Sequence, residues 1–222
     1  MKTLLREWNH IFQAPSSEEV TLRRLDGYNK TRYSRRKNKD GLLELASREA
    51  HDKQNTYYAT ILNDDDSPYC AIASNAGFWG VDFLRDNFDD YLIYDYRDSI
   101  SEDGRLFLLC ISLAECKPGT AEKIRRIDFR FLPDGSSTSK VYQGEAYDGT
   151  YEEIVEELPS LSGEELSRLW LDYPEFAKYD ELIRLDRIPE IVRQRIFEYT
   201  DQEYPAFREH LARDLAKYQG IE

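Results

Sequence analysis

Short runs in which apolar and polar residues alternate fill the middle of this 222-residue chain. Successive side chains of a β-strand point to opposite faces, so such runs predict strands with one buried face. In IRRIDFRFL, for example, Ile127, Phe129 and Phe131 form the apolar set, and charged residues alternate with them. Turn-forming clusters such as NDDDSP, SEDG and PDGSS separate the runs, which predicts a meandering antiparallel sheet of roughly eight strands. The predicted strands are VTLRRL, LLELASREA, TYYATIL, PYCAIAS, GFWGVDFL, YLIYDY, RLFLLCISL, IRRIDFRFL and KVYQGEA.

Helical patterns flank the predicted sheet. Near the N-terminus, apolar residues recur at helical spacing and predict a helix that docks on the rest of the chain. Near the C-terminus, Ser162 with Glu165 and Thr200 with Glu203 have the spacing of capping boxes, whose side chains bond the first free N–H groups of a helix. Three or four short helices are therefore predicted there. The N-terminal apolar residues are Leu4, Leu5, Trp8, Ile11 and Phe12.

The order of these elements predicts a fold class and a division of the chain. Strands that come first and helices that follow indicate an α+β protein with segregated elements, and not a βαβ alternation. We expect an N-terminal helix and a mainly antiparallel sheet within residues 1–158. A cluster of three or four helices within residues 159–222 is expected to pack on this sheet, so that the two regions form one compact unit.

The composition indicates a soluble globular protein. Apolar residues make up 41% and charged residues 33%, and 43 acidic against 30 basic residues give a formal net charge of −13. Arg6 and Glu7 interrupt the first apolar run before the core of a signal peptide forms. The longest apolar run, 106–114, is far shorter than the ~20 residues that cross a bilayer. Cys70 and Cys110 lie in apolar runs without C-x-x-C spacing, which is typical of buried thiols, so we expect a cytoplasmic protein.

No motif of a catalytic or cofactor-binding site stands out. The chain contains no H-E-x-x-H, G-x-S-x-G, P-loop or G-x-G-x-x-G pattern. His10, His51 and His210 are too scattered to predict a metal site. The sequence therefore predicts neither a cofactor nor a metal, and an enzyme is the less favoured interpretation. Carboxylates on neighbouring strands keep open an enzyme that acts on a small or cationic substrate.

A cluster of basic residues stands out against the acidic balance. Residues 23–39 contain eight basic residues and one acid, Asp26. The Asp26-Gly27 pair is a strong signal for a two-residue hairpin turn, so we expect a basic, solvated hairpin. Such a hairpin suits a charged edge strand, a nucleic-acid contact or a contact with an acidic surface. The basic patch consists of Arg23, Lys30, Arg32, Arg35, Arg36 and Lys37.

Acidic and aromatic residues occur together in two segments, 86–98 and 147–157. Charge speeds the encounter with a partner of opposite charge, and buried aromatic side chains slow its dissociation. We therefore predict an acidic protein-binding module that neutralises a basic protein by occlusion, in the manner of a bacterial immunity protein that inhibits a toxin. The alternatives are a carboxylate-based enzyme and a nucleic-acid contact through residues 23–39. The predicted partner-binding residues are Asp86, Asp89, Asp90, Tyr91, Tyr94, Asp95, Tyr96, Asp98, Glu152, Glu153 and Glu156.

Overall fold

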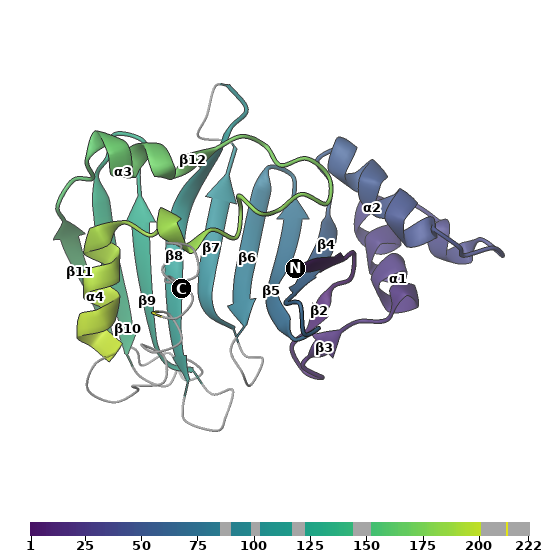
Figure 1. Ribbon diagram of the computed structural model, residues 1–222, viewed down its shortest axis with the longest axis horizontal. Coiled ribbons are helices and arrows are strands. Elements are labelled where there is room, and N and C mark those ends of the chain that lie inside the picture. Colours follow the sequence, from purple (N-terminus) through teal and green to yellow (C-terminus); the bar gives the residue numbers. More distant parts are fainter. Residues whose placement is uncertain (85–89, 99–102, 117–122, 144–151, 201–211, 213–222) are drawn as a thin grey trace.

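One large antiparallel sheet dominates the computed structural model, which describes residues 1–84, 90–98, 103–116, 123–143, 152–200 and 212 (Figure 1). Its strands are β1 Lys2–Leu4, β4 Tyr57–Leu62, β5 Pro68–Asn75, β6 Phe78–Leu84, β7 Asp90–Arg97, β8 Leu106–Cys116, β9 Lys123–Phe131, β10 Ser137–Gln143, β11 Glu152–Leu158 and β12 Trp170–Leu171. From β4 to β11 every strand pairs with the next one along the chain, which confirms the predicted meander. β1 lies beside β4, and β12 pairs with β8. The patterns had not predicted β11.

One face of the sheet holds most of the core. Val81 on β6, Tyr94 on β7 and Ile111 on β8 are direct cross-strand neighbours, and all three are fully buried. Burial of such side chains contributes roughly 1.5–3 kcal/mol each. The C-terminal elements cover this face (Figure 1). They are α3 (Gly163–Arg168), the segment 172–184, which we call the strap, η2 (Leu185–Arg187) and α4 (Glu190–Thr200).

The N-terminal segment is extended, so the prediction of a helix there is wrong. The Asn9 side chain accepts hydrogen bonds from the backbone N–H groups of Ile11 and Phe12, which stabilises a turn in place of a helix. Trp8 is buried, whereas Ile11 and Phe12 are exposed, so the predicted apolar stripe does not pack as one face. The remaining short strands of this segment are β2 (Trp8–Asn9) and β3 (Ala14–Pro15), which pair with each other.

The two runs VTLRRL and LLELASREA were predicted as strands and are helical. Leu22 and Leu25 lie three residues apart and are both buried, as one face of a helix requires. The Ser17 hydroxyl accepts a hydrogen bond from the N–H of Val20 and caps this helix. The helices of this region are α1 (Glu18–Asn29) and α2 (Leu42–Asp52), with the short turn η1 (Tyr33–Arg35) between them.

The predicted basic hairpin is therefore also wrong. Asp26 and Gly27 lie inside α1, which continues to Asn29. Lys30 ends the helix in a left-handed conformation with a φ of 57°. The helix continues past the local turn signal to Asn29, whose side chain exchanges two hydrogen bonds with the backbone of Thr56 and so fixes this end of α1.

The helices after the sheet agree with the prediction in part. Ser162 and Glu165 form the predicted capping box at the start of α3. The second predicted box, Thr200 with Glu203, lies outside the described residues. Among the residues that the structure describes up to 200, two helices precede the meander and two follow it, so the mixed α and β content is confirmed, whereas the predicted order of elements is not. In the described ranges no helix combines the length and the apolar character that a membrane crossing requires.

The strap connects the two ends of the fold. It leaves β12, reaches the end of α2 and returns to η2 (Figure 1). At its far end the Phe176 ring centroid lies 5.6 Å from that of His51, and Arg48 lies over Phe176. The Nδ1 atom of His51 lies 2.9 Å from the Tyr57 hydroxyl. Burial lowers the pKa of His51, so a neutral imidazole sits where the strap meets α2.

Candidate functional site

Two residues predicted to bind a partner belong to the core instead. Tyr94 and Tyr96 on β7 are fully buried beneath the strap. The Tyr96 hydroxyl donates to the backbone oxygen of Leu182 at 2.8 Å, and the Tyr94 hydroxyl donates to that of Arg184 at 3.4 Å. The prediction that these tyrosines face a partner is therefore wrong, because their phenol groups fasten the strap to the sheet.

The acids of the same segment do not form one surface. Asp95 is half-buried and points to the sheet face opposite Tyr94, since neighbours on a strand alternate. Asp98 follows the end of β7, where its N–H bonds to the Gly77 oxygen. Asp86 and Asp89 lie outside the described residues, and of Asp90 and Tyr91 the structure describes only the strand.

Asp95 belongs to a polar cluster on this second face. Across the neighbouring strands, Arg126 donates to Asp128 at 2.6 Å and to the Ser112 hydroxyl at 3.1 Å. Burial raises the pKa of Asp95, and the charge of Asp128 acts in the same direction, against the nearby arginines. Burial also raises the pKa of Cys110 to about 11, so this thiol stays protonated and is a poor nucleophile. The cluster offers one carboxyl suited to proton transfer, Asp95.

The predicted basic residues divide into paired and free groups. Arg23 forms an ion pair with Glu19, and Lys30 donates to the Gly27 oxygen. The Arg36 guanidinium lies over the Tyr33 ring. Arg32, Arg35 and Lys37 are exposed, and within the described residues their side chains form no hydrogen bond or ion pair. We call residues 30–39 the basic tip, since they contain six basic residues and no acid.

A groove of about 450 Å³ opens beside the strap. It lies where β12 is held against β8, with Trp170 opposite Phe107 in the register. The ring centroids of these two residues are 4.6 Å apart, and Arg105 lies over Trp170 at 5.0 Å. The groove is lined by Arg105, Trp170, Leu171, Asp172, Tyr173, Pro174, Glu175, Lys178, Glu181 and Arg187.

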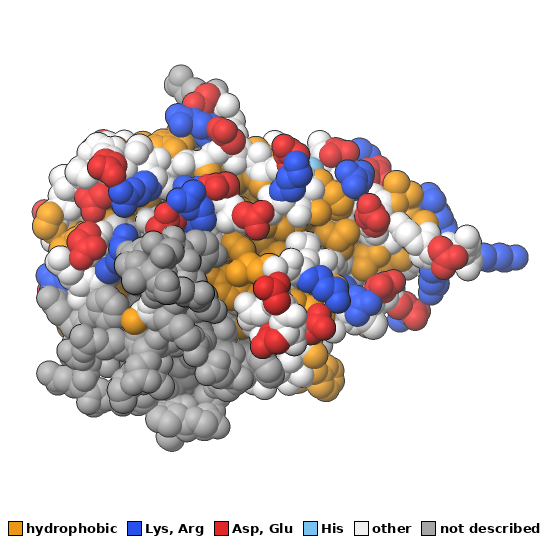
Figure 2. Space-filling view, in the orientation of Figure 1, with side chains coloured by type: hydrophobic (Ala, Val, Ile, Leu, Met, Phe, Trp, Pro, Cys, Tyr) orange, Lys and Arg blue, Asp and Glu red, His pale blue; other side chains and the backbone are white. Residues whose placement is uncertain are grey.

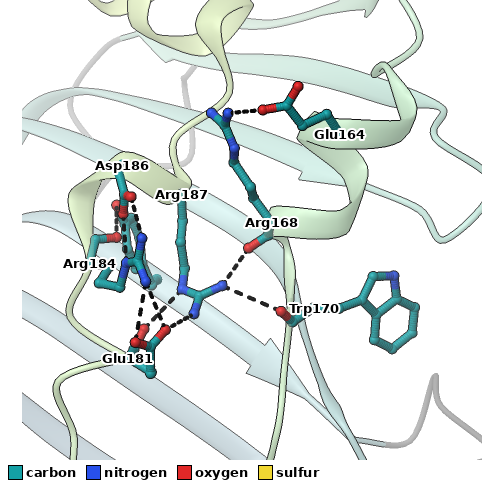
Figure 3. A network of polar contacts seen from close by, with 8 residues as sticks. Glu164, Arg168, Trp170, Glu181, Arg184, Asp186 and Arg187 are labelled. Carbon is teal, nitrogen blue, oxygen red and sulfur yellow. Dashed lines mark hydrogen bonds and ion pairs between the residues drawn. The ribbon is translucent and has the colours of Figure 1, made fainter. Parts of the chain in front are cut away.

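A buried arginine shapes the wall of the groove. Arg187 donates to the backbone oxygens of Arg168 and Trp170 on one side. On the other side it donates to the backbone oxygen and the carboxylate of Glu181, at 2.9 and 2.7 Å. Figure 3 shows this guanidinium between the start of β12 and the strap. Because this guanidinium is buried and makes four hydrogen bonds within the chain, Arg187 is a clamp that holds the strap.

The groove combines charged and aromatic side chains. Its described lining contains the carboxyl groups of Asp172, Glu175 and Glu181 and no serine, threonine, cysteine or histidine. Glu175 accepts from Lys178, which lowers the pKa of this carboxyl and keeps it ionised. Trp170 and Tyr173 are half-buried, and they give the groove an apolar wall next to its charges. Among the described residues, no group of three or more His, Cys, Asp and Glu could hold a metal ion.

Most of the groove lining comes from an acidic part of the chain. Residues 152–190, which we call the acidic surface, contain twelve acidic and four basic residues, a formal charge of −8. Figure 2 shows acidic and basic side chains side by side over α3 and the strap. Several acids are paired internally, such as Glu164 with Arg168 and Asp186 with Arg184. Glu157, Asp172 and Asp180 are exposed and have no ion pair within the described chain.

The sequence predicted one part of this surface and missed the other. Glu152, Glu153 and Glu156 were predicted, and all three lie in β11. The acids of the strap were missed because they are dispersed among apolar residues and form no short motif. A charge sum over a window of about 40 residues is the signal that finds them.

Comparison with known proteins gives no further assignment: no family model, no curated protein and no solved structure matches the chain significantly. The fold and the groove define the class of molecule as an α+β protein with a large antiparallel meander sheet and a charged groove beside its strap.

Proposed function

We propose that this protein binds a basic protein through the acidic surface and neutralises that partner by occlusion, as a toxin inhibitor of the immunity-protein type does. The observation that carries the proposal is the formal charge of −8 on the acidic surface, whose exposed acids Glu157, Asp172 and Asp180 have no ion pair within the described chain. A field of this sign attracts basic partners and raises the rate of encounter. This protein needs no catalytic activity for such inhibition, because it is enough that it covers the functional surface of the partner.

The groove provides a specific contact within this field. Arg105 already lies over the Trp170 ring and Phe107 packs against it, so the charge of a partner lysine or arginine is expected at the carboxylate of Asp172 and not over this ring. The aliphatic part of that side chain can lie along Tyr173. The partner contacts are therefore expected on β11, α3 and the strap, whereas residues 94–96 serve to support them.

Salt-dependent capture of a partner tests this proposal. The tagged protein is incubated with lysate of its native host at low salt, and retained proteins are identified by mass spectrometry as the salt concentration is raised. We expect one stoichiometric basic protein that dissociates with salt. The triple variant E157Q/D172N/D180N should retain it at least tenfold less well. The control D40N/D52N/D66N removes the same number of charges elsewhere and should retain it fully. Equal retention by both variants would contradict the proposal.

A carboxylate-based enzyme is the second candidate, and one observation favours it. Asp95 is a half-buried carboxyl of raised pKa near the carboxylate of Asp128, an arrangement suited to a general acid. This candidate requires turnover of a glycoside or a small cationic substrate by the wild-type protein. The activity should fall at least 100-fold in D95N, whereas the triple variant of the acidic surface should stay active.

A further inference from the structure

The edge of the sheet at β11 is unoccupied in the described part of the chain. All seven residues of β11 pair with β10 on one side, and no described strand pairs with the other side. Figure 1 shows β11 at the end of the sheet, next to α3 and α4. A strand edge presents a row of free backbone N–H and C=O groups that another strand can bond.

Both faces of this edge are open. Ile154 and Val155 point to opposite faces because they are neighbours on a strand, and they are 46% and 59% exposed. Glu156 and Glu157 are exposed as well. Four consecutive exposed residues of this kind leave room for a segment that lies along the strand.

The charge of β11 indicates which kind of strand can pair with its free edge. Its sequence, EEIVEEL, has four glutamates in seven residues. Pairing with β11 of a second copy would place glutamates opposite glutamates, and like charges directly opposite each other destabilise a sheet. Lysine or arginine opposite the glutamates stabilises it for the same reason. The contact of Arg195 with Glu156 at 3.5 Å shows that a guanidinium is accepted beside this strand.

We propose that the free edge of β11 binds an extended basic segment of the partner as an added strand of the sheet. Backbone hydrogen bonds supply affinity, lysine or arginine side chains pair with the glutamates, and apolar residues cover Ile154 and Val155. The inference rests on the proposed function, since it names the part of the acidic surface that engages the basic partner and the conformation that the partner adopts.

Synthetic peptides test strand addition directly. The probe is a labelled heptapeptide in which pairs of lysines alternate with pairs of valines, so that lysines can lie opposite the glutamates of EEIVEEL and valines opposite Ile154 and Val155. Its control has the same sequence with N-methyl groups at alternate positions, which keeps the charge and removes backbone donors. Binding to the full chain is followed by fluorescence anisotropy. We expect at least tenfold weaker binding of the methylated peptide and slower hydrogen exchange at β11 amides with the parent peptide. Equal binding of the two peptides would overturn strand addition.

Paired variants separate this inference from the proposed function. E156Q/E157Q should weaken binding of the parent peptide at least fivefold, whereas D172N/D180N, which changes two exposed acids of the strap and none of β11, should change it less than twofold. If both variants weaken the peptide equally without protection of β11 amides, the edge is not the site, although the acidic surface still binds basic chains. A dimer that forms without peptide and protects β11 amides would make a second copy the occupant and refute the proposal.

Discussion

The basic tip lies at one end of the molecule, whereas the acidic surface runs from β11 at the other end along the strap to α2 (Figure 1). The two regions also differ in how their charges are paired. At the tip, Arg32, Arg35 and Lys37 point to solvent without a partner in the described chain. On the acidic surface, most described carboxylates are paired, and one cation, Arg187, is buried. Charge density alone therefore does not tell how much a region depends on its charges for stability.

The two regions are also built differently. One carboxylate, Asp26, shapes the start of the tip by accepting from the Thr31 hydroxyl and from the N–H groups of Tyr33 and Ser34 at 2.6–2.8 Å. The strap instead depends on the guanidinium of Arg187, which binds chain segments on both sides. In each region a single buried or half-buried ion accepts or donates the hydrogen bonds that order the backbone.

The largest effect is expected from Arg187→Met. The change removes four hydrogen bonds and leaves buried carbonyl groups without donors, so the free energy of unfolding should fall by about 3 kcal/mol. Urea titration measures this loss. Arg184→Met is the matched control, since its side chain is 42% exposed and its pairs should contribute less than about 1 kcal/mol. Similar losses in both variants would show that Arg187 is no clamp.

At the other end, Asp26→Ala should lower the free energy of unfolding by about 1–2 kcal/mol through loss of its three bonds. Burial raises the pKa of Asp26, but hydrogen bonds from Ser34 and Thr31 outweigh it and lower this pKa on balance. The stabilisation is thus present at neutral pH and is lost as the pH falls below about 4. Hydrogen exchange at the Ser34 amide should accelerate. If hydrogen exchange at the Ser34 amide is unchanged, Asp26 is not the residue that orders the tip.

His51 should make the junction between the two regions sensitive to acid. Its pKa is lowered by burial, so the folded state binds a proton less readily than the unfolded state. Stability is therefore complete above about pH 6.5 and declines as the pH falls below that value, by about 1 kcal/mol at pH 5. Urea titrations at pH 7.5 and pH 5 measure the decline. The variant His51→Asn should lack this part of the pH dependence, and an unchanged profile would rule out His51 as its source.

A smaller effect of opposite sign is expected from Asp95→Asn. Because burial raises the pKa of Asp95, its ionised form costs stability above that pKa. Removal of the charge should raise the free energy of unfolding by about 0.5–1 kcal/mol at pH 7, and the gain should vanish below pH 4, where both states are protonated. Asp128→Asn should destabilise instead, since it weakens the bond from Arg126. Destabilisation by both variants would contradict this account.

The smallest effect on stability is expected from the triple change R32Q/R35Q/K37Q. These side chains have no partners in the described chain, so the free energy of unfolding should change by less than about 0.5 kcal/mol. The same variant tests the nucleic-acid alternative. If the wild type binds single-stranded DNA at low salt, the variant should bind it at least tenfold less tightly. A loss of more than about 1 kcal/mol would show that the tip depends on its charges after all.

The strands of the meander could be predicted because alternation is a local property. The runs that form β7 and β9 show it clearly, whereas β8 forms from a continuous apolar run that is buried on both faces and is an equally local signal. α1 was missed because Leu22 fits two patterns. Taken with Leu25 it has helical spacing, but taken alone it also fits an alternating strand. β11 was missed because its four glutamates interrupt the alternation of apolar and polar residues. The strand lies at the edge of the sheet and has no fully buried face that would require such alternation.

The site could be predicted less well than the fold. Leu92, Tyr94 and Tyr96 alternate with Ile93 and Asp95, so period two alone indicates that the tyrosines share a face with a buried leucine. The groove depends on contacts between β8, β12 and the strap, which are distant in sequence. No local pattern encodes such contacts, because they depend on the path of the chain after the sheet is complete.

That path has a consequence for the order of folding. The meander joins neighbours in sequence, so its pairings close short loops and are expected to form early. The bond from Tyr96 to Leu182 spans 86 residues and requires a finished sheet. The strap should therefore fold last, and native-state hydrogen exchange should find it among the first segments to open. A partner that binds beside the strap would then stabilise the least protected part of the chain and slow its opening.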